Sequence, residues 1–205
     1  LEQETIDYLH TKIKSINTTD TKITMFTISQ ICKAAVKYND FFKKKIDDKT
    51  IIDFTLNMLD KKNDFEIPQQ IEEYLLKDLK AHKKYNDDQF FYEHSPNLKS
   101  IMAKIYAASL INLPVCLQGP TGVGKTSLAI EFARNRPATI HMDETYSMLT
   151  FHAGTKSKDL YGTKTINNEQ VLFINGPLTT AMIKGLTFIA DEMNLSPNQT
   201  MKSIA

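Results

Sequence analysis

Apolar residues recur every three or four positions in four segments of the first half of the chain. That spacing places them on one side of an α-helix, so each segment is predicted to be amphipathic and helical. The four stripes are Ile6, Leu9, Ile13 and Ile16; Ile28, Ile31, Ala35 and Tyr38, running into Phe41 and Phe42; Ile51, Phe54, Met58 and Leu59; and Ile71, Tyr74, Leu75 and Leu79. Pro68 is expected at the first position of the fourth helix. Together they predict an all-α bundle over residues 1–80.

The pattern changes after residue 80. Residues 81–97 are mostly polar and are predicted to be a linker, whose end overlaps the start of another helix with Ser95 as its N-cap and Pro96 at its first position. All seven glycines of the chain lie beyond Leu113, so turns are concentrated in residues 98–205. This region is predicted to be an α/β domain.

Short apolar runs in this second region predict strands. Residues 113–118 (LPVCLQ) and 186–190 (LTFIA) are suited to buried strands, and residues 127–135 (SLAIEFARN) to a helix that ends before Pro137. The segment TKTINNEQVLFI predicts a β-hairpin that turns at Asn167 and Asn168.

A glycine-rich loop joins the first predicted strand to its helix. GPTGVGKT, residues 119–126, matches the pattern GxxxxGK[ST]. Backbone N–H groups must approach a polyphosphate closely, which side chains would hinder, and the positive end of the following helix attracts the anion. Lys125 is expected to reach the β- and γ-phosphates, and the Thr126 hydroxyl to ligate Mg²⁺. The predicted nucleotide-binding residues are Gly119, Pro120, Thr121, Gly122, Val123, Gly124, Lys125, Thr126 and Ser127. The alternative is a purely structural turn.

Two acidic residues follow the second predicted strand. A buried parallel strand would deliver Asp191 and Glu192 at its C-terminal edge. We expect Asp191 to hold Mg²⁺ and Glu192, with Lys125, to be catalytic, because a carboxylate there can orient and deprotonate a water molecule.

Charge and composition exclude several other classes. The net charge is +1, which argues against a general nucleic-acid-binding surface. Apolar runs are too short for a membrane span, and the chain is expected to be soluble and intracellular. Cys32 and Cys116 are interpreted as buried thiols, and His152 either as a structural residue or as a neighbour of the site.

The spacing of these motifs resembles the AAA+ ATPases. Asp159-Leu160 with Gly162, the hairpin, Gly176-Pro177-Leu178, Ala181, Gly185 and the DE-x-N-L-x-P pattern at residues 191–197 are similar to the dynein-related midasin branch. In that branch a hairpin is inserted into the second helix of the core. The resemblance implies an α/β P-loop NTPase core with Walker A and Walker B motifs, an incomplete parallel sheet, flanking helices and a hairpin insert.

The first half is similar to the helical lid that closes an AAA+ module. Ser29 stands where that lid usually carries a sensor arginine. Only ten residues follow Leu195, whereas the family needs further strands, a sensor, an arginine finger and a lid. The resemblance therefore implies a fragment of a tandem array that hydrolyses ATP slowly or not at all by itself.

The function implied by the resemblance is MgATP-driven remodelling of protein or ribonucleoprotein assemblies, with neighbouring AAA+ modules as partners. Ribosome biogenesis is the implied process, with a nuclear or nucleolar location if the resemblance extends that far and a cytoplasmic one otherwise. Three alternatives remain at this point: a scaffold module that binds nucleotide without hydrolysis, a GTP-dependent motor of a restriction system, and a free-standing helical partner-binding module in residues 1–94.

Overall fold

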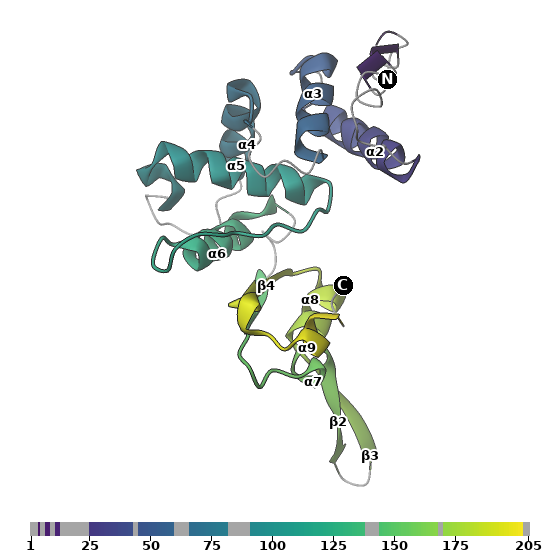
Figure 1. Cartoon of the computed structure of the whole chain (residues 1–205), viewed down its shortest axis with the longest axis vertical. Coiled ribbons are helices and arrows are strands. Elements are labelled where there is room, and N and C mark those ends of the chain that lie inside the picture. The colour runs from purple at the N-terminus through teal and green to yellow at the C-terminus, as the bar shows by residue number, and fades with distance from the viewer. Residues whose placement is uncertain are drawn as a thin grey trace. The chain divides into compact units, whose positions relative to one another are not determined.

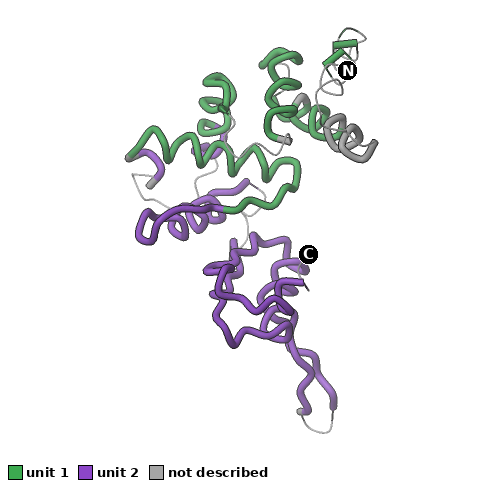
Figure 2. Tube along the Cα trace, viewed as in Figure 1, with its two compact units in different colours: residues 1–77, 95–116 green, residues 78–94, 117–205 purple. Residues whose placement is uncertain are grey.

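The computed structural model describes residues 4, 7–8, 11–12, 25–42, 45–59, 66–81, 91–137, 144–167 and 170–202. The chain divides into two compact units, coloured separately in Figure 2. One comprises residues 1–77 and 95–116, and the other residues 78–94 and 117–205. The domain boundaries expected from the sequence remain a prediction. No described helix combines the length and the apolar character that crossing a membrane requires.

The first unit is helical. It contains α2 (Met25–Phe42), α3 (Asp48–Leu59), most of α4 (Gln69–Ala81) and α5 (Pro96–Leu110). Pro68 lies just before α4, where its carbonyl accepts hydrogen bonds from the N–H groups of Ile71 and Glu72. Ser95 is the N-cap of α5 and Pro96 begins the helix, as predicted, although the Ser95 side chain makes no capping hydrogen bond. All four residues of the predicted stripe Ile6, Leu9, Ile13 and Ile16 lie outside the described residues.

Aromatic side chains form the core between these helices. Tyr38 of α2 contacts Phe54 of α3, with ring centroids 5.5 Å apart, and Phe42 of α2 contacts Tyr74 of α4 at 5.1 Å. The Tyr38 hydroxyl donates a 2.7 Å hydrogen bond to the carbonyl of Ala107 in α5. Burial raises the pKa of this hydroxyl, so it remains a donor. The predicted helical core is therefore present in the described residues, and its role as an AAA+ lid remains a prediction.

The second unit is α/β (Figure 1). Its helices are η1 (Phe91–His94), α6 (Lys125–Asn135), α7 (Ser157–Tyr161), α8 (Pro177–Lys184), η3 (Met193–Leu195) and α9 (Asn198–Lys202). Strands β1 (Tyr146–Thr150) and β4 (Thr187–Asp191) pair in parallel, with Tyr146 opposite Thr187 and Thr150 opposite Asp191. Helices α6 and α8 contact both strands. Side chains buried in this unit include Leu128, Phe132, Phe151, Leu160 and Ile189.

A hairpin interrupts the connection between the two parallel strands. Strands β2 (Gly162–Asn167) and β3 (Gln170–Asn175) pair antiparallel and extend from α7 and α8 as a two-stranded ribbon (Figure 1). Asn167 pairs with Gln170, so Asn167 ends β2 instead of lying in the turn as predicted. At the base, a Cβ on Gly162 would overlap the carbonyl oxygen of Ile174, and one on Gly176 would overlap that of Leu160. These two positions require glycine because the backbones meet there.

Two expectations are wrong. Residues 113–118 form no strand, because in the described part of the chain no neighbouring strand supplies the backbone hydrogen bonds that a strand needs. In the same segment Cys116 is exposed instead of buried. The side chain of Cys32 lies outside what the structure describes.

Candidate functional site

The glycine loop leads directly into helix α6. Gly124 is the N-cap of α6, with φ of 84°, and Gly122 has φ of 82°. Both values lie in the left-handed region that side chains disfavour, so the path of the loop depends on glycine at these two positions. The space beside Gly122 is open, since an added Cβ would meet no atom within 4 Å. The backbone of the loop therefore lies at the positive, N-terminal end of an eleven-residue helix.

Lys125 lies along this loop. Its ammonium group donates hydrogen bonds of 3.0 Å to the Gly119 carbonyl and 2.7 Å to the Pro120 carbonyl. These contacts place one positive charge at the loop. A lysine ammonium has three donors, so one remains beyond these two hydrogen bonds.

The other loop residues predicted to bind nucleotide lie at the surface. Pro120, Thr121, Val123 and Ser127 are exposed, and Thr126 is half-buried. Leu128 is the first fully buried residue of α6 and anchors the helix in the core.

The hydroxyl of Thr126 meets the carboxylate of Asp191 across a separation of 65 residues. Thr126 Oγ1 donates a 3.2 Å hydrogen bond to Asp191 Oδ1. Thr126 belongs to the first turn of α6, and Asp191 is the last residue of β4. The predicted strand 186–190 is thus observed as β4, and it brings the acidic residue to the glycine loop.

Asp191 is held by its neighbours. The Phe151 N–H donates a 2.8 Å hydrogen bond to the Asp191 carbonyl, which continues the pairing of β1 with β4. The Glu192 N–H donates to Asp191 Oδ1 at 3.2 Å. A hydroxyl and a carboxylate in contact are hard oxygen ligands of the kind Mg²⁺ takes alongside phosphate and water. The donor set therefore fits Mg²⁺.

Glu192 adopts an unusual backbone conformation. Its φ of 53° and ψ of 38° lie in the left-handed region, where Glu is uncommon. The side chain is exposed, and the Glu192 carbonyl accepts a 2.9 Å hydrogen bond from the N–H of Leu195, the last residue of η3. Backbone strain of this kind is common at functional sites. Here the strained residue is Glu192, which the sequence predicts to be catalytic.

His152 has a local structural role. Its Nδ1 accepts a 3.1 Å hydrogen bond from the Gly154 N–H, and its own N–H donates to Thr155 Oγ1 at 2.9 Å. These bonds shape the turn that follows β1. The structure therefore supports the structural interpretation of His152.

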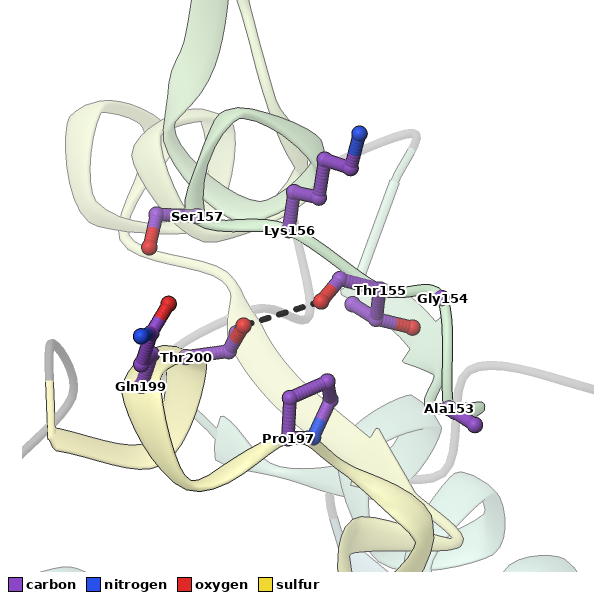
Figure 3. Close-up of a pocket in the computed structure, with 8 residues that line it drawn as sticks. All are labelled: Ala153, Gly154, Thr155, Lys156, Ser157, Pro197, Gln199 and Thr200. Atoms are coloured by element: carbon purple, nitrogen blue, oxygen red, sulfur yellow. Dashed lines mark hydrogen bonds between the residues drawn. The ribbon is translucent and has the colours of Figure 1, made fainter.

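A separate pocket of about 350 Å³ lies beyond that turn (Figure 3). Inside it Thr200 donates a 2.9 Å hydrogen bond to the Thr155 carbonyl, and both threonines are buried. The pocket shares no residue with the predicted nucleotide site, and no local sequence pattern predicted it. Its lining residues are Ala153, Gly154, Thr155, Lys156, Ser157, Pro197, Gln199 and Thr200.

A glycine loop at a helix N-terminus, with a carboxylate delivered by the end of a parallel strand, defines the P-loop NTPase class. Comparison with known proteins specifies the branch. Residues 114–204 match the AAA domain of the dynein-related subfamily. This segment of the chain therefore resembles an AAA domain of the dynein-related, midasin-like type.

Individual relatives agree with this assignment. The chain is 30% identical to midasin of Giardia intestinalis and 28% identical to midasin of Dictyostelium discoideum, each over 116 residues. Each alignment covers 55% of this chain and 2% of the relative. An uncharacterized protein of Staphylococcus haemolyticus is 32% identical over 96 residues, which cover 44% of this chain and 34% of that protein. The chain thus spans a small part of the midasins and about a third of the staphylococcal relative. No solved structure matches significantly.

Proposed function

We propose that the glycine loop and the Asp191-Glu192 pair form a site that binds MgATP and hydrolyses it. The observation that carries the proposal is the 3.2 Å contact between Thr126 Oγ1 and Asp191 Oδ1. It joins the two halves that phosphate-binding chemistry requires, a helix N-terminus and a carboxylate at a strand end.

Each residue of the site has a distinct role in this proposal. Backbone N–H groups between Gly119 and Ser127 bind the phosphates, except at Pro120, which has no N–H. Lys125 moves its ammonium from the Gly119 and Pro120 carbonyls toward the β- and γ-phosphates. Thr126 and Asp191 hold Mg²⁺, which when bound neutralises charge on those phosphates. Glu192 orients a water molecule and takes its proton.

We infer the wider role from the similarity to midasin. The similarity to midasin supports a module that works beside other AAA+ modules and remodels a protein or ribonucleoprotein assembly. We place this activity in ribosome biogenesis and in the nucleus or nucleolus, as the midasin resemblance implies.

Two substitutions test the site. A fluorescent ATP analogue titrated into the chain with Mg²⁺ should bind roughly ten- to a hundredfold more weakly to Lys125→Ala, because charge-assisted hydrogen bonds to phosphate are lost. Lys158→Ala, which removes an exposed lysine outside the loop, serves as the matched control and should bind normally.

Glu192→Gln separates binding from turnover. In the full-length protein this variant should bind ATP as the wild type does and release phosphate at least about a hundredfold more slowly, since an amide is a poor base. Wild-type phosphate release by Glu192→Gln would contradict the role given to Glu192. Unchanged binding by Lys125→Ala would contradict the site itself.

A further inference from the structure

The hairpin exposes apolar side chains on both of its faces. Five of them are solvent-exposed on this two-stranded ribbon. Exposure reaches 76% for Ile166, 67% for Val171 and 54% for Phe173. Because opposite residues of an antiparallel pair share a face, these three lie together on one face with Lys164, and Leu172 and Ile174 lie on the other. An isolated two-stranded ribbon is at best marginally stable in water, so this composition favours a further strand.

The two edges of the ribbon differ. Edge strands normally avoid association by carrying charge, and β2 carries Lys164. β3 reads QVLFIN and contains no charged residue, proline or glycine. Among the described residues no strand pairs with the other side of β3. Alternate residues of β3 therefore direct their N–H and C=O groups toward an open edge.

We propose that the β3 edge pairs antiparallel with β3 of a second copy of this chain, so that two hairpins form a four-stranded sheet. The sequence of β3 favours its own copy, because polar residues flank four apolar ones and no like charges meet across a two-fold axis. A register centred on Leu172 sets Val171 opposite Phe173 of the copy. Aromatic and β-branched residues in that arrangement form a favourable cross-strand pair.

The small size of the contact sets its strength. Two six-residue strands bury much less than the roughly 1,200–2,000 Å² typical of stable protein interfaces. The association is therefore weak and depends on concentration, as suits modules that also have other neighbours.

Sedimentation velocity over a concentration series tests the proposal on the 205-residue chain. Phe173→Lys and Val171→Glu are both placed at exposed positions, so each should fold normally by circular dichroism. Each should weaken self-association by about tenfold or more, because a charged side chain then lies opposite an apolar one across the new sheet. Met182→Lys removes a still more exposed apolar residue on α8 and should leave association unchanged.

Mixing the two hairpin variants gives the decisive result. In the proposed register, Lys at position 173 of one copy faces Glu at position 171 of the other, while the second Val171–Phe173 pair remains apolar. An equimolar mixture should therefore associate more tightly than either variant alone. A wild-type chain that stays monomeric at all concentrations, or a mixture no tighter than its components, would overturn the proposal.

Discussion

Replacing Glu192 with glycine removes the proposed catalytic base. It should nevertheless leave the free energy of unfolding higher than glycine does at an exposed position with negative φ. Glu192 is one of two non-glycine residues with positive φ among the described residues, the other being Asn112. The Glu192 side chain is exposed, so its removal should disrupt little packing. Its backbone bonds to Asp191 and Leu195 do not depend on the side chain.

The magnitude follows from two opposing contributions. A residue with a Cβ pays about 1–2 kcal/mol for the left-handed conformation, which glycine avoids. Glycine in turn loses about 0.5–1 kcal/mol of folding free energy because its unfolded chain is more flexible. The net change for Glu192→Gly should therefore lie between about zero and 1.5 kcal/mol of stabilisation.

A neighbouring substitution isolates the first contribution. Asn194 is exposed in η3 and has negative φ, so Asn194→Gly incurs only the cost in flexibility, about 0.5–1 kcal/mol of destabilisation. Urea unfolding of both variants should give free energies of unfolding that differ by about 1–2 kcal/mol in favour of Glu192→Gly. Equal destabilisation by the two would refute the argument that Glu192 is strained.

Two further substitutions probe local geometry. Gly176→Ala should lower the free energy of unfolding, measured in urea, by roughly 1–3 kcal/mol, because the added Cβ would overlap the Leu160 carbonyl. Gly154→Ala is the control and should cost much less, because its Cβ would meet only the side chain of His152. Equal costs for the two variants would contradict close backbone contact at the hairpin base. Asp47→Ala should cost about 1 kcal/mol at pH 7, because Asp47 accepts hydrogen bonds from Thr50 at the start of α3. Those bonds lower the pKa of Asp47, so the difference from wild type should be full above about pH 4 and shrink as the pH falls through the lowered pKa; a difference independent of pH would contradict this.

Local sequence patterns predicted the elements whose determinants are themselves local. The glycines of the loop, the run that becomes α6 and the alternation in the hairpin each specify a conformation over a few residues. The strand before Asp191 was predicted from its apolar run. Because β4 ends at Asp191, the carboxylate of this residue lies within hydrogen-bond distance of the Thr126 hydroxyl.

Elements that depend on distant partners were predicted less well. Strand β1, YSMLT, was not predicted because it is short and half-buried and its partner β4 lies 41 residues further along the chain. Residues 113–118 have the composition of a strand and yet form none, since a strand also needs neighbours. The left-handed backbone conformation of Glu192 could not be predicted from the sequence, because glutamate is not a residue that favours turns.

The base of the hairpin closes on itself. The Gly176 N–H donates a 3.0 Å hydrogen bond to the Tyr161 carbonyl, and the Thr179 hydroxyl donates to the same carbonyl at 2.7 Å. These hydrogen bonds join the end of α7 to the start of α8, and neither of them involves the hairpin residues between the two helices. The part of the hairpin beyond Gly162 can therefore differ in length or sequence without moving β1 and β4. We therefore expect this junction to accept insertions of different length while the candidate nucleotide site stays in place.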